Sequence, residues 1–274
     1  MGRPELRYRL TTKMDVSPER SLLIDRLPED SRPAAASPTI SAVLPVFEER
    51  DGLSEVVTEL ERALQSTGLS YEIILVDDGS KDGSGDWIRE ASLTRAGIVG
   101  VHLAKRSGQS AALVAGFRIA RGEIVITLDA DGQNDPADIP LLLQHLGNAD
   151  VVSGVRRKRE DSWIRRRSSR IANGVRRRVL GDTITDIGCS LKAYRRPALE
   201  GLPVFQGVHR FLPALCQFRG ARVVEVLVNH RPRQRGVSKY GVGNRLGRGI
   251  HDLVGVLWLR ARLLDYQIRE VTHV

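Results

Sequence analysis

Residues 122–136 read GEIVITLDADGQNDP, and this stretch decides the fold. Its first half is a short run of apolar, mostly β-branched residues, which is typical of a buried strand. The run stops at Asp129, and a second carboxylate follows at Asp131. Both carboxylates are therefore expected at the end of a strand, where parallel sheets place their ligand sites.

The same alternation extends along the chain on both sides of this stretch. Apolar runs predict strands at residues 40–46, 71–76, 98–103, 124–128 and 150–152. Helical periodicity predicts helices between them, over residues 53–64, 84–96, 109–120 and 137–146. Strands and helices that alternate with short connections predict an α/β fold, a doubly wound, mostly parallel sheet with helices on both faces.

Composition places the chain among ordinary globular proteins. It has 274 residues and 41% apolar residues, which suits one large domain or two small ones and excludes a wholly disordered chain. Two cysteines, Cys189 and Cys216, do not make a disulfide scaffold, so the reducing cytoplasm is expected. The first residues lack the apolar segment of a secretory signal. The apolar run 253–259 is shorter than the ~20 residues that a membrane-spanning helix needs.

The positive charge is concentrated in one segment. Residues 156–178 hold eleven basic and two acidic side chains. The net charge of this segment is therefore +9, the same as that of the whole chain. Nucleic acid, an anionic membrane surface, a phosphorylated substrate and a merely solvated helix face all remain open as explanations. Nucleic acid is the least favoured, because no zinc-finger spacing, aromatic RNA-binding motif or heptad repeat accompanies the charge.

The acidic turn at Asp129 and Asp131 is suited to a divalent cation. Two hard carboxylate ligands on one side of a turn fit Mg²⁺ or Mn²⁺, which a protein commonly holds together with substrate phosphates. A solvated acidic turn is the alternative. An EF-hand is excluded, because Pro140 stands where its final glutamate belongs.

A second acidic turn, Asp77-Asp78-Gly79-Ser80, follows the strand at 71–76. Its carboxylates can accept hydrogen bonds from a nucleotide base or ribose. A tight Asp-Gly turn without a ligand explains the same residues equally well. The glycine-rich motifs of dinucleotide-binding and P-loop proteins are absent from the sequence.

Together these motifs resemble glycosyltransferase family 2, and within it the polyprenyl-phosphate glycosyltransferases. The resemblance covers residues 40–246 and rests on the order and spacing of six segments: LPVFEE (44–49), EIILVDDGSKDGS (72–84), GQSAALVAGFRIARGEIVITLDADGQNDP (108–136), SGVRRKRED (153–161), TDIGCSLKAYRR (185–196) and RQRGVSKYG (233–241). It implies a GT-A-type fold with one catalytic domain at 38–241. A flexible leader is expected at 1–37, and an amphipathic membrane-surface helix and tail at 242–274.

The resemblance also implies roles for individual residues. Those expected to bind the nucleotide or another part of the substrates are Pro45, Glu48, Asp77, Asp78, Gln133, Arg156, one of 165–167, Lys192, Arg235, Ser238 and Lys239. Asp129 and Asp131 are expected to hold the divalent ion, Mg²⁺ or Mn²⁺, on the donor diphosphate. Asp131 is also expected to be catalytic, and so is Asp186, the latter as a positioning residue across the sugar.

The sequence departs from the family pattern in one motif. The usual arginine of D-x-x-S-G-F-R-A-Y is Lys192 here, which keeps the charge but loses the bidentate geometry of a guanidinium. Cys189 fills a small-residue position in the same motif, and a buried, inert thiol is expected there. Many family members continue into membrane-spanning helices after the catalytic domain, and no such segment is found in this sequence.

The C-terminal region predicts how the chain meets a lipid substrate. Residues 245–264 place apolar side chains at helical spacing among arginines, which is typical of a helix lying in the bilayer interface or of one packed on the core. A lipid-linked acceptor favours the interface.

The expected function is metal-dependent transfer of a sugar, with inversion, from a UDP- or GDP-linked donor to a polyprenyl phosphate. The expected location is peripheral, on the anionic cytoplasmic face of the cell membrane, with an integral-membrane partner left open. The alternatives are transfer to another lipid or to a polysaccharide, a sugar nucleotidyltransferase, and a basic nucleic-acid-binding protein.

Overall fold

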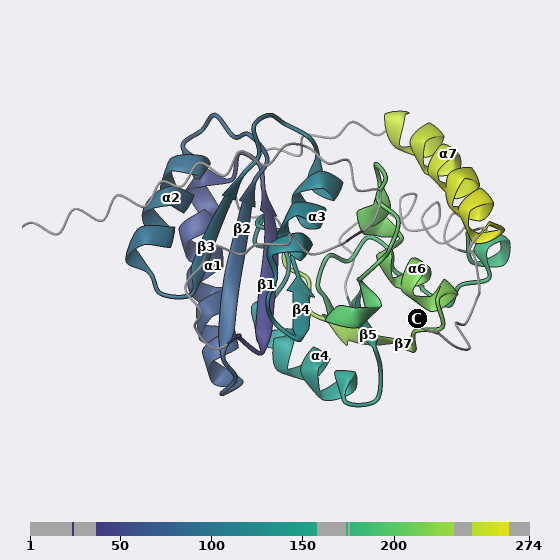
Figure 1. The fold of residues 1–274 in the computed structure, drawn as a ribbon, viewed down its shortest axis with the longest axis horizontal. Coiled ribbons are helices and arrows are strands. Elements are labelled where there is room, and N and C mark those ends of the chain that lie inside the picture. Colours follow the sequence, from purple (N-terminus) through teal and green to yellow (C-terminus); the bar gives the residue numbers. More distant parts are fainter. Residues whose placement is uncertain (1–23, 25–36, 158–173, 175, 233–242, 263–274) are drawn as a thin grey trace, which may run out of the picture.

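A computed structural model describes residues 24, 37–157, 174, 176–232 and 243–262 (Figure 1). Its centre is a seven-stranded sheet in the order β3-β2-β1-β4-β6-β5-β7. The strands are β1 (Ile40–Val46), β2 (Tyr71–Asp77), β3 (Ile98–His102), β4 (Ile124–Thr127), β5 (Val151–Arg156), β6 (Lys192–Arg195) and β7 (Val223–Val228). Only β6 is antiparallel to its neighbours among these strands. The predicted doubly wound, mostly parallel sheet is confirmed.

Helices cover both faces of this sheet. They are α1 (Arg50–Ser66), α2 (Ser84–Thr94), α3 (Gln109–Ile119), α4 (Ile139–Leu146), α6 (Leu212–Phe218) and α7 (Gly243–Arg260), with short 3-10 turns η1 (Pro136–Asp138), η2 (Arg196–Ala198) and η3 (Val208–Arg210). Each strand alternates its side chains between two buried clusters, as a pleated sheet covered on both faces requires. One cluster lies under α1 and α4, and the other under α3, α6 and part of α7.

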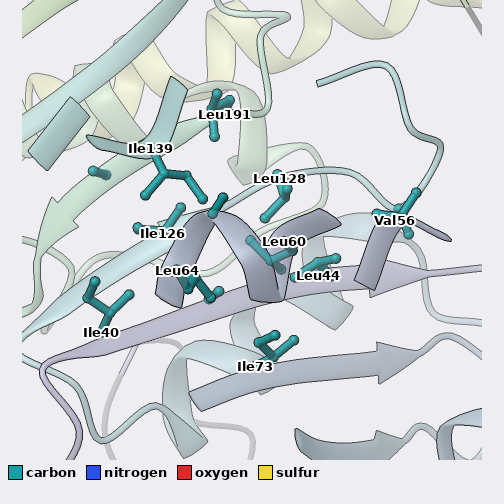
Figure 2. Close-up of a cluster of buried hydrophobic side chains, with 14 of the residues drawn as sticks. Ile40, Leu44, Val56, Leu60, Leu64, Ile73, Ile126, Leu128, Ile139 and Leu191 are labelled. Carbon is teal, nitrogen blue, oxygen red and sulfur yellow. The ribbon is translucent and has the colours of Figure 1, made fainter. Parts of the chain in front are cut away.

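The first cluster fixes α1 and α4 on their face of the sheet. Figure 2 shows Leu60 and Leu64 of α1 near Leu44 of β1, and Ile139 of α4 belongs to the same cluster. All four side chains are fully buried. Burying each such side chain stabilises the fold by about 1.5–3 kcal/mol.

The predicted elements differ from the observed ones mainly at their ends. Helix α1 begins at Arg50 rather than 53, and the helix expected at 137–146 starts as the separate turn η1, where the Asp135 carboxylate accepts from the Ala137 N–H. β5 continues to Arg156 instead of stopping at 152. β6, β7 and α6 were not predicted.

Two observations bear on the ends of the chain. Ile24, inside the expected leader, is buried in the second cluster, and its backbone exchanges hydrogen bonds with Leu202 and Gly201. Within the described residues, no helix is long and apolar enough to cross a membrane. The division into segments 1–37, 38–241 and 242–274 stays a prediction.

Candidate active site

The carboxyl ends of β1 and β2 are joined by hydrogen bonds between their loops. Pro45 lies within β1, and Glu48 follows the strand with φ of +53°, a left-handed conformation that is uncommon for a residue with a Cβ. The backbone N–H of Glu48 donates to Ser80 Oγ at 2.9 Å, and that of Glu49 donates to Ser84 Oγ at 3.1 Å. Such backbone outliers are concentrated at functional sites.

Asp77, at the end of β2, holds the turn that follows it. One of its carboxylate oxygens accepts from the Ser80 N–H at 2.9 Å, and the other lies 3.4 Å from His102 Nδ1. The side chain is 5% exposed. These contacts of the Asp77 carboxylate fix the turn after β2 and the end of β3.

Asp78 fixes the loop that leads into α3. Its two oxygens accept from the backbone N–H groups of Ser107 at 2.6 Å and Gly108 at 2.8 Å. The approach of the two loops requires glycine at position 79, where φ is +74° and a Cβ would lie 2.9 Å from the Arg106 nitrogen. Each carboxylate oxygen can accept more than one hydrogen bond, so these two bonds leave Asp78 able to accept another from a base. The contact between Asp78 and a base stays a prediction.

The loop held by Asp78 delivers Gln109 to the end of β4. The Gln109 side-chain amide donates to Asp129 Oδ1 at 2.7 Å. Burial, and next the negative charge of Asp131, raise the pKa of Asp129 to about 6, against the opposing charge of Lys192. Asp131 accepts from the Gln133 N–H at 3.1 Å, which closes the turn. Two carboxylates that repel each other at a sheet edge fit a divalent cation, because the cation relieves the repulsion.

A cavity of about 160 Å³ lies beside Asp129 and reaches Lys192 and Cys189. Lys192 is 3% exposed, and its ammonium donates to the Cys189 carbonyl oxygen. The pKa of Lys192 is lowered, because burial outweighs the negative charges of Asp129 and Asp186, which act to raise it. The structure thus places a buried cation next to the predicted metal ligands. Burial also raises the pKa of the Cys189 thiol, as expected for an inert cysteine.

Asp186 and Arg156 form a bidentate ion pair. Arg156 Nε and Nη2 each donate to a different oxygen of the Asp186 carboxylate, both at 2.8 Å. The backbone N–H of Arg156 also points to Asp186, at 3.3 Å. Fork-to-fork pairs of this kind fix both side chains in direction as well as in distance.

A second, smaller cavity of about 40 Å³ opens at Asp131, between α1 and the turn after β4. Arg231 forms part of its wall. The guanidinium lies 2.6 Å from Glu59 and 2.9 Å from Asp135, and the backbone N–H donates to the Gln133 carbonyl at 2.8 Å. The segment after β7 is therefore attached to the turn that carries the predicted metal ligands.

A scan of the chain against family models places residues 41–202 in glycosyl transferase family 2. That match covers more than half of the sequence. The chain belongs to glycosyltransferase family 2. It is therefore a glycosyltransferase.

Curated relatives of this glycosyltransferase share its sequence over most of its length. It is 42% identical over 221 residues to an undecaprenyl-phosphate 4-deoxy-4-formamido-L-arabinose transferase of Edwardsiella ictaluri, covering 80% of this chain and 67% of the relative. A protein of the same name from Aeromonas hydrophila is 39% identical over 217 residues, covering 78% and 66%. The chain thus spans about two thirds of the length of each of these relatives.

Solved structures support the fold of the glycosyltransferase. Glucosyl-3-phosphoglycerate synthase from Mycobacterium tuberculosis, in complex with Mn²⁺, UDP and glucosyl-3-phosphoglycerate, superposes with a TM-score of 0.61 at 20% identity, covering 86% of this chain and 88% of that one. A mannosyltransferase from Pyrobaculum calidifontis, with GDP-Man and Mn²⁺, gives 0.56 at 19% identity, covering 86% and 66%. At these identities the likeness establishes the GT-A-like fold.

The structure of the glycosyltransferase brings several predicted site residues together. Asp129 and Asp186 both lie close enough to Lys192 for their charges to act on it, and Arg156 is paired with Asp186. Arg235, Ser238 and Lys239 lie outside the described residues, as do residues 165–167. In the part of the chain that is described, no three His, Cys, Asp or Glu side chains gather as a metal site.

Gln109, His209 and Arg210 are among the residues at the cavity of the glycosyltransferase that were not predicted. Gln109 stands inside the quoted segment 108–136, and its position before an apolar helix run could have marked it. His209 and Arg210 carry no local signal. They reach the cavity because Ser110 Oγ, in the first turn of α3, bonds His209 Nδ1 at 2.7 Å and accepts from the Gly207 N–H at 2.9 Å.

Proposed function

We propose that this glycosyltransferase moves a sugar from a nucleotide-sugar donor to a polyprenyl phosphate of the undecaprenyl or dolichyl type, with inversion at the anomeric carbon. The observation that carries the proposal is the arrangement at the end of β4. Asp129 there borders a cavity that also contains the buried cation of Lys192. The names of the curated relatives support the acceptor, and the bound UDP and GDP-Man of the structural neighbours support the donor.

The nucleotide binds across the ends of β1 and β2 in this proposal. Pro45, Glu48 and Asp77 form that edge, and Asp78 meets the base with lone pairs left over from its bonds to the loop before α3. Gln133 lies in the turn just after Asp131. The donor diphosphate is thereby directed toward the turn after β4.

Asp129 and Asp131 would hold the Mg²⁺ or Mn²⁺ ion. Bound there, the ion would supply positive charge to the departing diphosphate. The pKa of Asp129 is raised first by burial and next by the negative charge of Asp131, and a bound cation would relieve both effects. Within the described residues the protein offers too few ligands for a complete cage, which suits an ion that also takes oxygens from substrate phosphates.

The acceptor phosphate supplies the nucleophile. One of its oxygens forms a bond to the anomeric carbon while the bond from that carbon to the donor diphosphate breaks, and the nucleoside diphosphate leaves. A phosphate monoester has a second pKa near ~6, so it is largely ionised at neutral pH and needs little help from a base. Asp186 therefore positions substrate, and its bidentate pair with Arg156 holds it ready to do so.

Helix α7 provides the contact with an anionic membrane. Leu253, Val256 and Leu259 face the second buried cluster. On the remaining surface, Val254 is 60% exposed, Leu257 39% and Trp258 59%, and Arg260 and Arg262 lie beside them exposed. The helix thus packs on the core and also presents an apolar face flanked by cations, which suits peripheral binding to the inner face of the cell membrane.

The test is transfer of label into lipid. Membranes and purified enzyme are incubated with a panel of radiolabelled UDP- and GDP-sugars, and label is counted in the organic phase. The proposal expects one donor to give Mg²⁺- or Mn²⁺-dependent labelling that Asp131→Asn abolishes. Asp86→Asn, an equal charge change on an exposed part of α2, is the control. Labelling of a water-soluble acceptor only would overturn the lipid assignment.

A further inference from the structure

Arg210 connects the cavity beside Asp129 with helix α7. Its side chain forms part of the cavity wall, together with Lys192. Its Nη2 lies 2.6 Å from Oδ2 of Asp252, a residue of α7. Its Nε is buried and has no hydrogen-bond partner among the described residues. The Arg210 side chain therefore links the wall of the cavity to the Asp252 carboxylate of α7.

Gly207 allows this ion pair to form. At this position φ is +94°, and a Cβ would lie 2.7 Å from Asp252 Oδ2 and 3.0 Å from Arg210 Nη2. Any larger residue would push the pair apart. The Gly207 N–H is fixed by Ser110, which also bonds His209, so the segment that carries Arg210 is held from the side of α3.

The charges around the cavity suit an anionic group. Lys192 and Arg210 are cations in its wall, and Asp129 is predicted to be matched by a divalent ion. A guanidinium binds carboxylates and phosphates with the same forked geometry. The Asp252 carboxylate therefore occupies, on Arg210, the kind of position that a phosphate oxygen would take.

We propose that Arg210 binds the phosphate of a prenyl phosphomonoester and that Asp252 is an internal competitor which this phosphate displaces. The inference rests on the proposed function, because the phosphomonoester is the acceptor assigned there. Helix α7, which carries Asp252, also carries the exposed apolar side chains of Val254, Leu257 and Trp258, on the side of the helix opposite Asp252.

A purely structural role for the ion pair makes a different prediction. If Arg210 only braces α7, then losing either partner breaks the same contact, and both changes alter acceptor binding in the same direction. If Arg210 binds phosphate and Asp252 competes, the two changes act in opposite directions. Removing the arginine weakens binding, and neutralising the aspartate strengthens it.

The experiment uses the full chain saturated with Mn²⁺ and with UDP or GDP, whichever binds. Farnesyl phosphate is titrated in by calorimetry below its critical micelle concentration. Arg210→Ala should weaken its binding at least about tenfold, the effect of one charge-assisted hydrogen bond. Arg210→Lys should recover part of this loss. Asp252→Asn should tighten binding severalfold relative to the unchanged chain.

Controls separate this inference from the proposed function. Binding of UDP and of GDP with Mn²⁺ is measured first, and the nucleotide that binds is used in the titration. Its affinity should be the same in every variant; failure of the unchanged chain to bind either nucleotide counts against the proposed function instead. Should Arg210→Ala not fold, Arg210→Lys and Asp252→Asn still give opposite directions. Weaker farnesyl phosphate binding in both Arg210→Lys and Asp252→Asn, or no change in either, would overturn the proposal. So would equal affinity for inorganic phosphate, which identifies a free-phosphate site.

Discussion

Replacing His209 by asparagine should remove a loss of stability that the chain suffers in mild acid. Burial, and next the positive charges of Arg210 and Lys192, lower the pKa of His209 to about 3, whereas an unfolded chain has a histidine pKa of 6.5. Below pH 6.5 the unfolded state therefore binds a proton at this histidine, whereas the folded state keeps it neutral. Stability is lost progressively as the pH falls from 6.5 toward 3, and between pH 7 and 5 this one group costs about 2 kcal/mol.

Urea unfolding of both proteins at a series of pH values between 7 and 5 measures this slope. The asparagine side chain can keep the bond to Ser110 but cannot take up a proton in this range, so His209→Asn should lose about 2 kcal/mol less than the unchanged chain. Asp129 titrates in the opposite sense, since its raised pKa stabilises the fold on acidification, but it does so equally in both proteins. His145→Asn, at an exposed position on α4, is the control and should leave the slope unchanged. Identical pH dependence in His209→Asn and the unchanged chain would refute a buried, neutral His209.

Other substitutions test the site and the membrane face. Asp131→Asn should retain the fold and lose most activity, because one ligand charge is removed; circular dichroism and label transfer check this, and full turnover of the unchanged chain in excess EDTA would contradict it. Asp78→Ala should weaken binding of both the free nucleoside and its diphosphate, whereas Asp129→Ala should weaken only the metal-bound diphosphate; calorimetry measures both, and equal losses would mean that the pocket is misassigned. Trp258→Glu should reduce co-sedimentation with anionic vesicles at unchanged stability. Val256→Ala should instead lower the free energy of unfolding by about 1–2 kcal/mol while vesicle binding is retained. The reverse pattern would exclude the exposed face as the membrane contact.

The first half of the fold could be predicted because its signals are local. β1, β2 and β4 are mostly apolar runs that end at acidic turns, and that pattern suffices for both their type and their direction. β6 could not be predicted in the same way, since KAYR holds two charges in four residues. It is a strand because its backbone pairs with both β4 and β5, while Ala193 and Tyr194 are buried in the clusters on opposite faces of the sheet. That pairing is a property of the folded sheet.

In the candidate site too, residues with a local sequence signal could be predicted, and contacts between distant positions could not. Asp129 and Asp131 were predicted from one short turn after an apolar strand. The pair between Arg156 and Asp186 joins positions thirty residues apart, and no sequence period connects them. The bond between Ser110 and His209 spans ninety-nine residues. Contacts of that range are set by tertiary packing, so a single sequence shows the residues without showing which ones meet.

The place of β6 has a consequence for how the chain assembles during synthesis. β3, β2, β1 and β4 are adjacent in the sheet and can pair as they leave the ribosome, but the far edge of β4 has no neighbour until Lys192–Arg195 emerge. An open edge of that kind can pair with another chain, so the partly synthesised chain can aggregate until β6 is made. β5 must wait as well, because β6 separates it from β4. The strand that closes this edge also carries Lys192, so the sheet is completed and the buried cation arrives beside Asp129 in one step.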